Sequence, residues 1–387
     1  MLFRSRTHRG KRLDFVHNPF IVRLYKDQHQ DIVVMKSTQC GVSEWLLCLV
    51  IPGAMSGRNV FYVLPDYGLV SRFVMERFDK TMRMTPSYWK FRQEAKFKQA
   101  SSVTMKQLGP GTISFAGSTV VNAFTEFAAD WYVIDELDRC DQSNLEMGWE
   151  RLSNAEQQNI RQVKVSNPTI TGFGIDAEYA RTNQAEWFIR HDCGHLVHPD
   201  FFRHVIRDVG GGQFVYADEE YDPESGQDCR MICDICGRPI DRRGQGEWVA
   251  KYPNVDRHGY HISKLFSANV KLIDLVKRYE AGEANPDAMV RFYNGDLGLA
   301  YDSPGARISK EMLDECIADY NVGQVPADGA CIAGIDVGAV FNVSIGHMAY
   351  GVPGVNLVDA REIRSAEELL DLDRKSTRLN SSHGKLS

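Results

Sequence analysis

The residue types best suited to chemistry in this chain are two adjacent carboxylates, Asp135 and Glu136, which directly follow the segment WYVI at 131–134. Aromatic and β-branched residues favour a buried strand, so the two acids stand where such a strand ends. An acid at that position can hold Mg²⁺, and a neighbouring glutamate can orient a water molecule for attack on a phosphate. The alternative is an ordinary strand followed by solvated acids. A phosphate-binding loop upstream would decide between the two.

A loop of this kind lies between a strand expected at 31–35 and an apolar segment at 44–50 that we expect to be helical. In a strand–loop–helix unit, the loop N–H groups and the helix N-terminus face a bound anion. The standard motif G-x-x-x-x-G-K-[ST] has its lysine directly before the Ser or Thr. Here Val42 takes that position and Lys36 begins the loop, from which its side chain could still reach the β- and γ-phosphates of ATP. The expected nucleotide-binding residues are Lys36, Ser37, Thr38, Gln39, Cys40, Gly41, Val42, Ser43 and Asp135, with Ser43 as a ligand of Mg²⁺.

Further strands are expected at 59–64, at 111–116 and from Val163 onward, with helical stretches between them. Strands that alternate with helices predict a mostly parallel sheet covered on both faces. Ligands of such sheets bind at the carboxyl ends of the strands. This arrangement places Lys36, Asp135, Glu136, Ser166 and Asn167 along one edge. The sequence therefore predicts an α/β fold of the P-loop NTPase class that hydrolyses ATP.

The phosphate loop contains no arginine, although phosphoryl transfer commonly uses one to stabilise the transition state. Arg72, Arg77 and Arg139 are candidates within the chain. An arginine from a neighbouring subunit is a further alternative.

An aromatic segment near the N-terminus has two interpretations. Residues 15–20, FVHNPF, surround a turn-forming Asn-Pro. Their rings could stack on adenine while Gln28 or Gln30 binds the edge of the base. The alternative, which we favour, is an N-terminal arm that packs against the rest of the protein.

With 387 residues, 43% of them hydrophobic and 25% charged, the chain has the composition of a globular protein of two or three domains. Its formal net charge of −6 does not by itself predict a nucleic-acid partner, so contact with DNA must use local basic patches. The longest apolar run, 45–51, is far shorter than the roughly 20 residues that cross a bilayer, and we expect no membrane partner. The nine cysteines predict reduced thiols in a cytoplasmic protein.

Cysteine and histidine cluster in one region with the spacing of a zinc site. Cys233 and Cys236 form a C-x-x-C-G turn, and Cys193 lies upstream beside His191. Two thiolates on one tight turn fit the tetrahedral geometry of Zn²⁺. We expect Cys193, Cys233 and Cys236 to bind a structural zinc ion, with His191 or His195 as the fourth ligand. A hairpin without metal is the alternative.

The segment ACIAGIDVG at 330–338 has the pattern of a strand that ends on Asp336, with further strands expected at 342–349 and 355–358. An aspartate in this position is compatible with a structural turn. It is also compatible with a nuclease site in which two metal ions stand about 4 Å apart. Such a site needs further acids, and Glu362 with the acids after it looks instead like part of a solvated helix, expected at 365–372.

The end of the chain differs from the rest. Residues 373–383, DRKSTRLNSSH, look like the translation of a sequencing adapter, and the segment 373–387 has no apolar face. We expect this tail to be disordered. We also expect the chain to be a fragment that stops inside its last domain, so that it does not cut DNA.

The order of these motifs closely resembles the large terminase subunit of tailed bacteriophages, of the lambda-like, GpA type. The resemblance rests on KSTQCGVSEW, WYVIDELD and VSNPT, and it continues through GYHISKLFSAN, FYNGDLGLAYD and GIDVG over about residues 15–350. This family is an ATP-driven motor that packages viral DNA into a preformed shell and cuts it with a second, nuclease domain.

The resemblance implies a role for each motif. Lys36 and Ser43 would belong to the Walker A element, Asp135 and Glu136 to Walker B, and the segment Ser166, Asn167 and Pro168 would couple hydrolysis to DNA movement. Lys36 and Glu136 would be catalytic, and Asp336 would be a catalytic Mg²⁺ ligand in the start of an RNase H-like nuclease domain. Related terminases carry a zinc ribbon with two C-x-x-C-G turns. This sequence departs from that pattern, because Arg190 stands where the first turn would have its leading cysteine.

The resemblance also implies the partners: double-stranded viral DNA, the small terminase subunit, the portal of the procapsid and further copies of the chain. The protein would then work in the host cytoplasm, transiently docked on the procapsid. The expected organisation is a P-loop ATPase core (1–185), a zinc-ribbon-like insertion (186–245), the remainder of the ATPase domain with a linker (246–325), a truncated RNase H-like nuclease domain (326–372) and the adapter-derived tail (373–387).

Two other functions fit parts of the sequence. A helicase-like remodelling ATPase is compatible with the acidic box DELD at 135–138, but the displaced Lys36 and the Asp336 strand favour a terminase. A zinc-ribbon nucleic-acid-binding protein without hydrolysis is the second alternative. It would lose no activity on Lys36→Ala, whereas a motor would lose ATP turnover.

Overall fold

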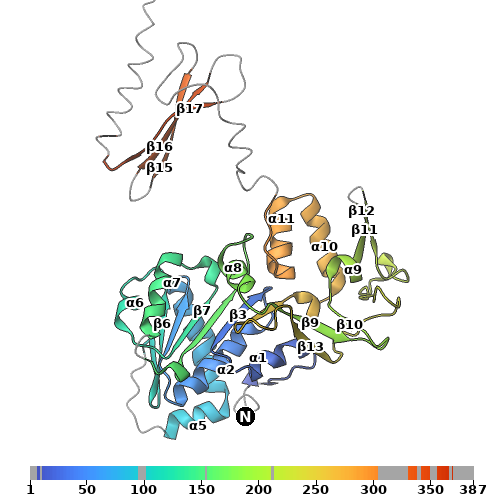
Figure 1. Cartoon of the computed structure of the whole chain (residues 1–387), viewed down its shortest axis with the longest axis horizontal. Coiled ribbons are helices and arrows are strands. Elements are labelled where there is room, and N and C mark those ends of the chain that lie inside the picture. The colour runs from blue at the N-terminus through green and yellow to red at the C-terminus, as the bar shows by residue number, and fades with distance from the viewer. Residues whose placement is uncertain are drawn as a thin grey trace, which may run out of the picture. The chain divides into compact units, whose positions relative to one another are not determined.

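A computed structural model describes residues 7–8, 11–94, 102–152, 155–210, 213–303, 330–337, 341–348, 355–365 and 368. The chain divides into two compact units, residues 1–307 and 308–387 (Figure 1). In the described part of the chain, no helix is both long enough and apolar enough to cross a membrane.

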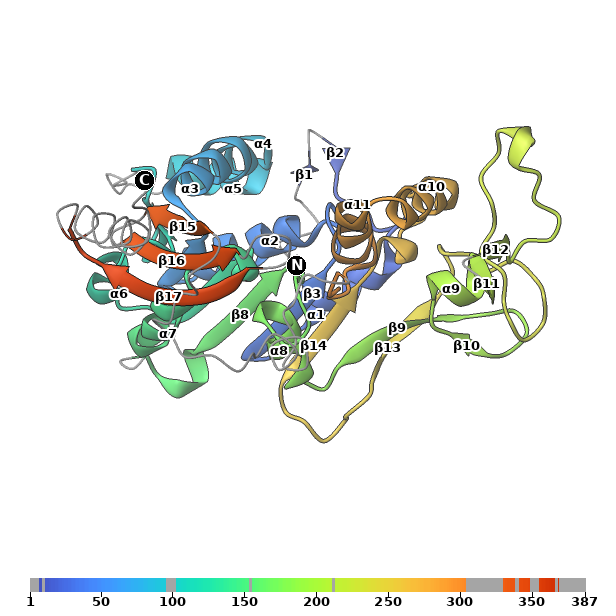
Figure 2. The ribbon, with the colours of Figure 1, turned by 90° about the horizontal axis from the view of Figure 1, so that it is seen from above.

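The first unit is built on a ten-stranded sheet with helices on both faces (Figures 1 and 2). Its strand order is β10-β9-β14-β3-β8-β7-β4-β6-β5, and β13 pairs with β9. Neighbouring strands from β9 to β6 are parallel, whereas β5, β10 and β13 run antiparallel to their partners. The predicted mostly parallel α/β sheet is confirmed. The strands are β3 (Asp31–Lys36), β4 (Val60–Leu64), β5 (Met105–Leu108), β6 (Gly111–Gly117), β7 (Trp131–Asp135), β8 (Arg161–Ser166), β9 (Ala185–Arg190), β10 (Leu196–Val197), β13 (Gly246–Ala250) and β14 (His258–Ile262).

Helices and small ribbons complete the first unit. The α-helices are α1 (Val22–Lys26), α2 (Val42–Met55), α3 (Tyr67–Phe73), α4 (Asp79–Met84), α5 (Pro86–Glu94), α6 (Ala123–Glu126), α7 (Gln142–Trp149), α8 (Gly174–Ala180), α9 (Phe201–His204), α10 (Leu272–Glu283) and α11 (Pro286–Val290). Two π-helical turns, η3 (Val74–Phe78) and η9 (Arg291–Leu297), continue α3 and α11. Two antiparallel ribbons pair β1 (Thr7–His8) with β2 (Lys11–Arg12), and β11 (Ile206–Gly210) with β12 (Gln213–Tyr216).

The alternation of side chains along β3 explains why both faces of the sheet are covered. Ile32 and Val34 belong to the large core that includes α2. Val33 and Met35 point to the opposite face, where they pack against Ile175 and Tyr179 of α8. A central parallel strand that is apolar on both faces needs cover on both, as its sequence DIVVMK predicts.

The aromatic residues near the N-terminus pack inside the protein. The ring of Phe15 lies 4.9 Å from that of Tyr25, and the buried Phe20 meets Phe266 at 5.8 Å. The indole N–H of Trp248 donates to the backbone oxygen of Phe20 (2.8 Å). These contacts favour the packed-arm interpretation over adenine stacking.

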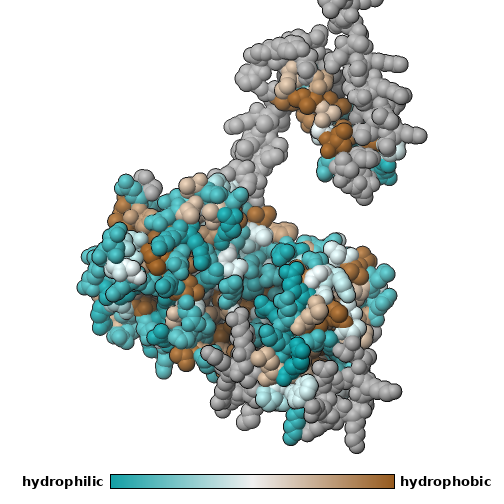
Figure 3. Space-filling model, turned by 180° about the vertical axis from the view of Figure 1, so that it is seen from behind, coloured by the Kyte–Doolittle hydropathy of each residue, from teal (hydrophilic) through white to brown (hydrophobic). Residues whose placement is uncertain are grey.

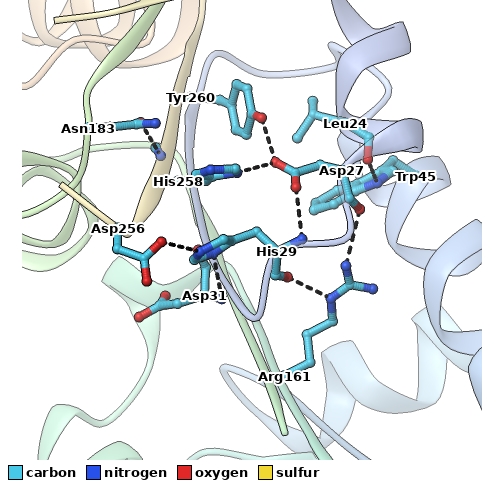
Figure 4. A network of polar contacts seen from close by, with 11 residues as sticks. Leu24, Asp27, His29, Asp31, Trp45, Arg161, Asn183, Asp256, His258 and Tyr260 are labelled. Atoms are coloured by element: carbon cyan, nitrogen blue, oxygen red, sulfur yellow. Dashed lines mark hydrogen bonds and ion pairs between the residues drawn. The ribbon is translucent and has the colours of Figure 1, made fainter. Parts of the chain in front are cut away.

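A polar network around Asp27 fixes the end of this arm to the sheet (Figure 4). The Tyr260 hydroxyl donates to Asp27 Oδ2 (2.5 Å), and His258 Nδ1 lies 2.7 Å from the same oxygen. The backbone N–H of His29 donates to Asp27 Oδ1 (2.8 Å), and Arg161 donates to the backbone oxygen of Asp27 (3.1 Å). The network joins the residues before β3 to β14 and β8. Burial raises the pKa of Asp27, but the bonds from Tyr260, His29 and His258 outweigh it and leave the pKa below its ordinary value.

Replacing Asp27 with asparagine should lower the free energy of unfolding by about 2–3 kcal/mol at neutral pH, because hydrogen bonds to a charged group contribute about 1.5–3 kcal/mol each. A depressed carboxyl pKa stabilises the fold above the unfolded value and stops doing so as the pH falls through the folded value. The difference between wild type and variant should therefore shrink below about pH 4. Urea unfolding near pH 7 and near pH 3 measures both effects.

The matched control for this substitution is Asp256→Asn. Asp256 is fully exposed and lies 3.2 Å from His29 Nε2. A surface pair of this kind contributes little to stability, because solvent screens the two charges. Equal effects of the two substitutions would contradict the structural importance of the Asp27 network.

The second unit is a three-stranded antiparallel sheet of β15 (Ala330–Val337), β16 (Phe341–Met348) and β17 (Asn356–Ile363). Its small core consists of Val343, Ile345, Val358 and Ile363. On the face drawn in Figure 3, the first unit is mainly hydrophilic, whereas hydrophobic side chains gather in the second. The exposed hydrophobic residues of the second unit are Ile332, Ile335, Met348, Val355 and Leu357.

One prediction for this unit is wrong: Glu362 does not belong to a helix but lies in β17, where it pairs with Asn342. The third strand is longer than expected because Ile363 adds an apolar side chain to the core and pairs with Phe341. Strand pairing and burial outweigh the weak strand preference of the polar residues before it. Most of the helix predicted at 365–372 and all of the tail at 373–387 lie outside the described residues.

Candidate nucleotide and metal sites

The polar residues predicted at the strand ends lie together. Lys36 is the last residue of β3, Asp135 of β7 and Ser166 of β8, and β8 lies between the other two strands. Lys36 Nζ donates to Glu136 Oε1 (3.1 Å) and to Asn167 Oδ1 (2.9 Å). The lysine at the start of the loop thus contacts residues that directly follow β7 and β8.

The loop after β3 leads into α2 through Gly41, which has a φ of 84° and precedes the first helical residue, Val42. A residue with a side chain would be strained in this left-handed conformation. The first turn of an α-helix has N–H groups without intrahelical partners, and these attract anions. The start of the loop is fixed from behind: Ser37 N–H donates to Ile262 O (2.7 Å), and Thr38 N–H donates to Gly295 O (2.8 Å).

A cleft of about 990 Å³ lies over this loop. Its lining residues are Lys36, Thr38, Gln39, Cys40, Gly41, Val42, Ser43, Glu44, Met75, Glu76, Arg77, Lys80, Thr81, Arg83, Met84, Glu136 and Asn167. Of the predicted nucleotide-binding residues, Ser37 and Asp135 do not line the cleft, because both are buried behind it. The cleft is large enough for a nucleotide, since ligand pockets commonly measure about 300–1,000 Å³.

Asp135 is buried and held by Tyr62, whose hydroxyl donates to Asp135 Oδ2 (2.9 Å). Burial and the charge of Glu136 raise the pKa of Asp135 to about 6, against the opposing effects of Lys36, Tyr62 and Arg77. Within the described residues, Asp135 Oδ1 and Ser37 Oγ are buried without a hydrogen-bond partner. Buried polar atoms normally have partners, so the free lone pairs of Asp135 Oδ1 suit Mg²⁺ or one of its water ligands.

Glu136 has a φ of 59°, the left-handed conformation that residues with side chains rarely adopt. Such strain is commonly found at functional sites. The turn directs the glutamate carboxylate to Lys36 rather than along the strand. Burial lowers the pKa of Lys36, but the charges of Glu136, Cys40 and Asp135 outweigh it and raise the pKa above the ordinary value. Lys36 is therefore a cation at neutral pH.

Three exposed cations, Arg77, Lys80 and Arg83, also line the cleft. Within the described residues, none of their side chains makes an ion pair or a hydrogen bond to protein. Arg77 belongs to the π-helical turn η3, a distortion often found at functional sites. The other candidate arginines, Arg72 and Arg139, do not line the cleft. No sequence signal marks the π turn, and the sequence alone does not distinguish the three arginines.

The predicted coupling segment contacts the site directly. Besides accepting from Lys36, Asn167 donates through Nδ2 to Asn294 O (3.3 Å), and the Ser166 hydroxyl donates to Asn167 O (2.9 Å). Pro168 is buried. Asn294 and Gly295 of the η9 turn accept hydrogen bonds from Asn167 and Thr38. The sequence analysis did not predict these contacts, because no motif links η9 to β3, which lies more than two hundred residues earlier in the chain.

The predicted zinc ligands form a second site. The ligand atoms of His191, Cys193, Cys233 and Cys236 all lie within 4.8 Å of one another. His191 Nε2–H donates to Pro239 O (3.1 Å), and Cys193 N–H donates to His191 Nδ1 (3.2 Å), so Nδ1 carries the lone pair. Nδ1 lies 3.9 Å from Cys236 Sγ. Four donors at these separations suit a tetrahedral ion with Zn–S bonds of about 2.3 Å, and the bond to Pro239 orients the imidazole.

Asp336 is exposed on β15 and pairs with Asn342 of β16. It does not belong to a group of three or more potential metal ligands within the described residues.

Comparison with known protein families identifies two domains in the chain. The model of "Phage terminase large subunit gpA, ATPase domain" matches residues 20–251, and that of "Terminase large subunit gpA, endonuclease domain" matches residues 257–366. Comparison with curated protein sequences finds no match.

Solved structures of phage terminases are also similar to the chain. The large terminase ATPase domain of Thermus phage P74-26 is 13% identical, with 75% of this chain and 95% of that chain covered and a TM-score of 0.40. The large terminase of a thermophilic bacteriophage is 11% identical, with 93% and 71% covered and a TM-score of 0.41. A structure of the latter terminase in complex with ADP is 11% identical, with 95% and 74% covered and a TM-score of 0.39. The assignment rests on the family models, of which the ATPase model alone spans more than half of the sequence. The chain therefore belongs to the gpA-type terminase large subunits of phages, the ATP-hydrolysing motor subunits of viral DNA packaging.

Proposed function

We propose that the cleft over the β3–α2 loop is the ATP site of the packaging motor. Lys36 and the N–H groups of residues 39–43 hold the β- and γ-phosphates. Ser43 and Asp135 would hold Mg²⁺, which would supply positive charge to offset the negative charge that develops during transfer. Glu136 orients the attacking water and accepts its proton.

The observation that supports this proposal most strongly is the pair of bonds from Lys36 Nζ to Glu136 and Asn167. These bonds bring together the cation Lys36, the candidate base Glu136 and the side chain of Asn167 from the proposed coupling segment. A fold that used these residues only for stability would not need a strained Glu136 or a lysine turned into a solvent-accessible cleft.

Replacing Lys36 with alanine should lower kcat for ATP hydrolysis by about 10²–10³-fold, because one preorganised charge at the phosphates is removed. Nucleotide affinity should fall as well, while the melting temperature stays near that of wild type. The control is Lys277→Ala, an exposed lysine on α10 away from the cleft. Full turnover in a well-folded Lys36→Ala protein would show that the nucleotide site lies elsewhere.

The family assignment favours this function over the helicase-like ATPase and the non-hydrolytic zinc-ribbon protein. As further parts of the proposal, the motor takes double-stranded viral DNA as its cargo and binds its phosphates through basic side chains, so that binding weakens with salt. It works with a small terminase subunit, the portal of the procapsid and further copies of itself, in the host cytoplasm. Ser166, Asn167 and Pro168 couple hydrolysis to movement of the DNA.

We also propose that His191, Cys193, Cys233 and Cys236 hold a structural Zn²⁺. The fit of the four donor atoms, together with the bond that orients His191, supports this proposal. The metal would link the C-x-x-C turn, which the bond from Gly237 N–H to Cys233 O closes, to the segment that carries His191 and Cys193.

Purified protein should contain about one zinc per chain, and Cys233→Ser should reduce the content several-fold, because structural sites need all four ligands. The matched control is Cys229→Ser, since Cys229 is a buried cysteine of the same segment outside the cluster. His191→Ala and His195→Ala form a second pair, in which only the first should lose zinc. Elemental analysis measures each protein. Zinc far below one per chain in the wild type would exclude the site.

Asp336 is proposed as a Mg²⁺ ligand of the nuclease. Its position on the first strand of the second unit, inside the region matched by the endonuclease model, supports the proposal.

A further inference from the structure

Asp138 joins the nucleotide site to a helix on the far face of the sheet. It lies in the 3-10 turn η4 (Leu137–Arg139) that directly follows Glu136. Its carboxylate is half-buried and accepts three hydrogen bonds. Thr169 donates to Oδ2 through its backbone N–H (3.0 Å) and its hydroxyl (2.8 Å), and the backbone N–H of Ile175 donates to Oδ1 (2.8 Å).

Asp138 makes a fourth hydrogen bond, which connects it to the proposed ATP site. The backbone N–H of Asp138 donates to Ser166 Oγ (3.1 Å), which in turn donates to Asn167 O (2.9 Å). The side chain of Asn167 accepts from Lys36. Asp138 therefore follows Glu136 closely along the chain, and a series of hydrogen bonds through Ser166 and Asn167 connects it to Lys36.

The helix held by Asp138 is α8, which begins at Gly174. A Cβ atom on Gly174 would lie 2.5 Å from the Asp138 carboxyl carbon, and its φ is 55°, so this close approach requires glycine. Ile175 and Tyr179 of α8 pack against Val33 and Met35 of β3, the strand that ends on Lys36.

Outside this junction, α8 forms part of a groove of about 510 Å³ that it shares with α7. Trp149 at the end of α7 and Phe173 before α8 line the groove and are exposed. A shift of α8 relative to α7 would therefore change the shape of an accessible surface.

We propose that Asp138 is a positioning residue that transmits the nucleotide state from Glu136 and Asn167 to α8 and so to the α7–α8 groove. This inference rests on the proposed ATP site. An aspartate is suited to the role because its two oxygens accept from two separate segments at once, and removal of a bond to a charged carboxylate shifts a local equilibrium by about tenfold or more.

Hydrogen exchange of the backbone amides of residues 175–181 tests the proposal. In the wild type, with Mg²⁺, their protection should differ by about fivefold or more between ADP and a non-hydrolysable ATP analogue. In Asp138→Ala the difference should fall below about twofold although both nucleotides still bind, because the connection to α8 is cut. ATP hydrolysis without DNA should stay close to that of wild type.

Asp141→Asn is the matched control. Asp141 also caps a helix, through Asn144 N–H (3.2 Å) at the start of α7, but it makes no bond to the described segment 166–175. It should keep the nucleotide response of α8. If Asp138→Ala does not fold, Thr169→Val serves instead, because it removes one donor to the carboxylate and preserves side-chain volume. This variant should reduce the response in part.

The outcomes separate the two proposals. Wild-type protein that binds no nucleotide overturns the ATP site itself. Wild-type protein that binds both nucleotides without a difference in α8 protection overturns only the coupling. A full response in Asp138→Ala, or in Thr169→Val where the former does not fold, also overturns the coupling, since α8 would then respond by another route.

Discussion

Arg77→Ala should lower kcat for ATP hydrolysis by about 10³–10⁵-fold, the range by which a transition-state arginine accelerates phosphoryl transfer. Arg77 lines the cleft, and within the described residues it has no acidic or hydrogen-bonding partner that would hold it away from a ligand. The positive charge of Arg77 partly offsets the rise that burial and Glu136 cause in the pKa of Asp135. Nucleotide affinity should change by less than about tenfold, because the charge acts mainly on the transition state. Steady-state kinetics and nucleotide binding measure the two quantities separately.

Arg72→Ala is the matched control, since Arg72 lies on α3, shortly before the π turn, and does not line the cleft. It should retain turnover. Arg77→Lys should recover little activity, because a lysine cannot offer the two parallel donors of a guanidinium group. Full activity of Arg77→Ala would mean that the arginine comes from elsewhere.

A mixing experiment distinguishes action within one chain from action on a neighbour. Lys36→Ala lacks a working phosphate loop, and Arg77→Ala lacks the arginine. If Arg77 serves its own cleft, a mixture of the two variants stays inactive. If Arg77 acts in the cleft of a neighbouring subunit, the mixture regains turnover. The intact Arg77 of a Lys36→Ala subunit can then complete the cleft of an Arg77→Ala subunit, whose Lys36 is intact.

Glu136→Gln should reduce kcat by about 10²–10⁴-fold while nucleotide binding is retained, because the amide keeps the shape of the side chain but cannot take up a proton. The structure adds a reason for retention of binding: the amide oxygen of the substituted side chain can still accept from Lys36, as Glu136 does now at 3.1 Å. Product formation in a single turnover, measured beside equilibrium binding of ATP, separates the two effects.

The control for this substitution is Glu76→Gln, the same chemical change at another residue that lines the cleft. It should leave turnover within about twofold of wild type, since an exposed carboxylate there has no role in proton transfer. If Glu136→Gln hydrolyses ATP at the wild-type rate, the water is activated by another group and the assignment of Glu136 fails.

The grouping of polar residues in the candidate nucleotide site could be predicted from sequence because parallel strands bring their carboxyl ends to one edge. Lys36, Glu136 and Asn167 each lie at the end of a strand with a clear apolar pattern, and the structure joins them with hydrogen bonds. The grouping of His191 and Cys193 with the two cysteines of the C-x-x-C-G turn was predictable for a different reason: few chemical roles suit such a turn, and both residues were potential ligands upstream.

The parts that could not be predicted depend on contacts between distant residues. The choice of Arg77 over Arg72 requires the π turn, which has no sequence signature here. The three bonds to the Asp138 carboxylate come from residues whose neighbourhood is set only by the packing of α8 on β3. Glu362 was assigned to a helix because local composition favours one, whereas its place in β17 follows from pairing with β16.

The order of strands in the sheet has a consequence for synthesis on the ribosome. β3 is the third strand to emerge, but one of its two neighbours is β14, and the N–H groups of Ser37 and Thr38 depend on Ile262 and Gly295 as acceptors. Contacts that close such long loops form late, because the entropy of closure must be overcome first. The phosphate loop is therefore among the first segments translated and among the last to become rigid. A nascent chain that stops at residue 251, where the match to the ATPase family ends, contains every residue that lines the cleft but neither acceptor.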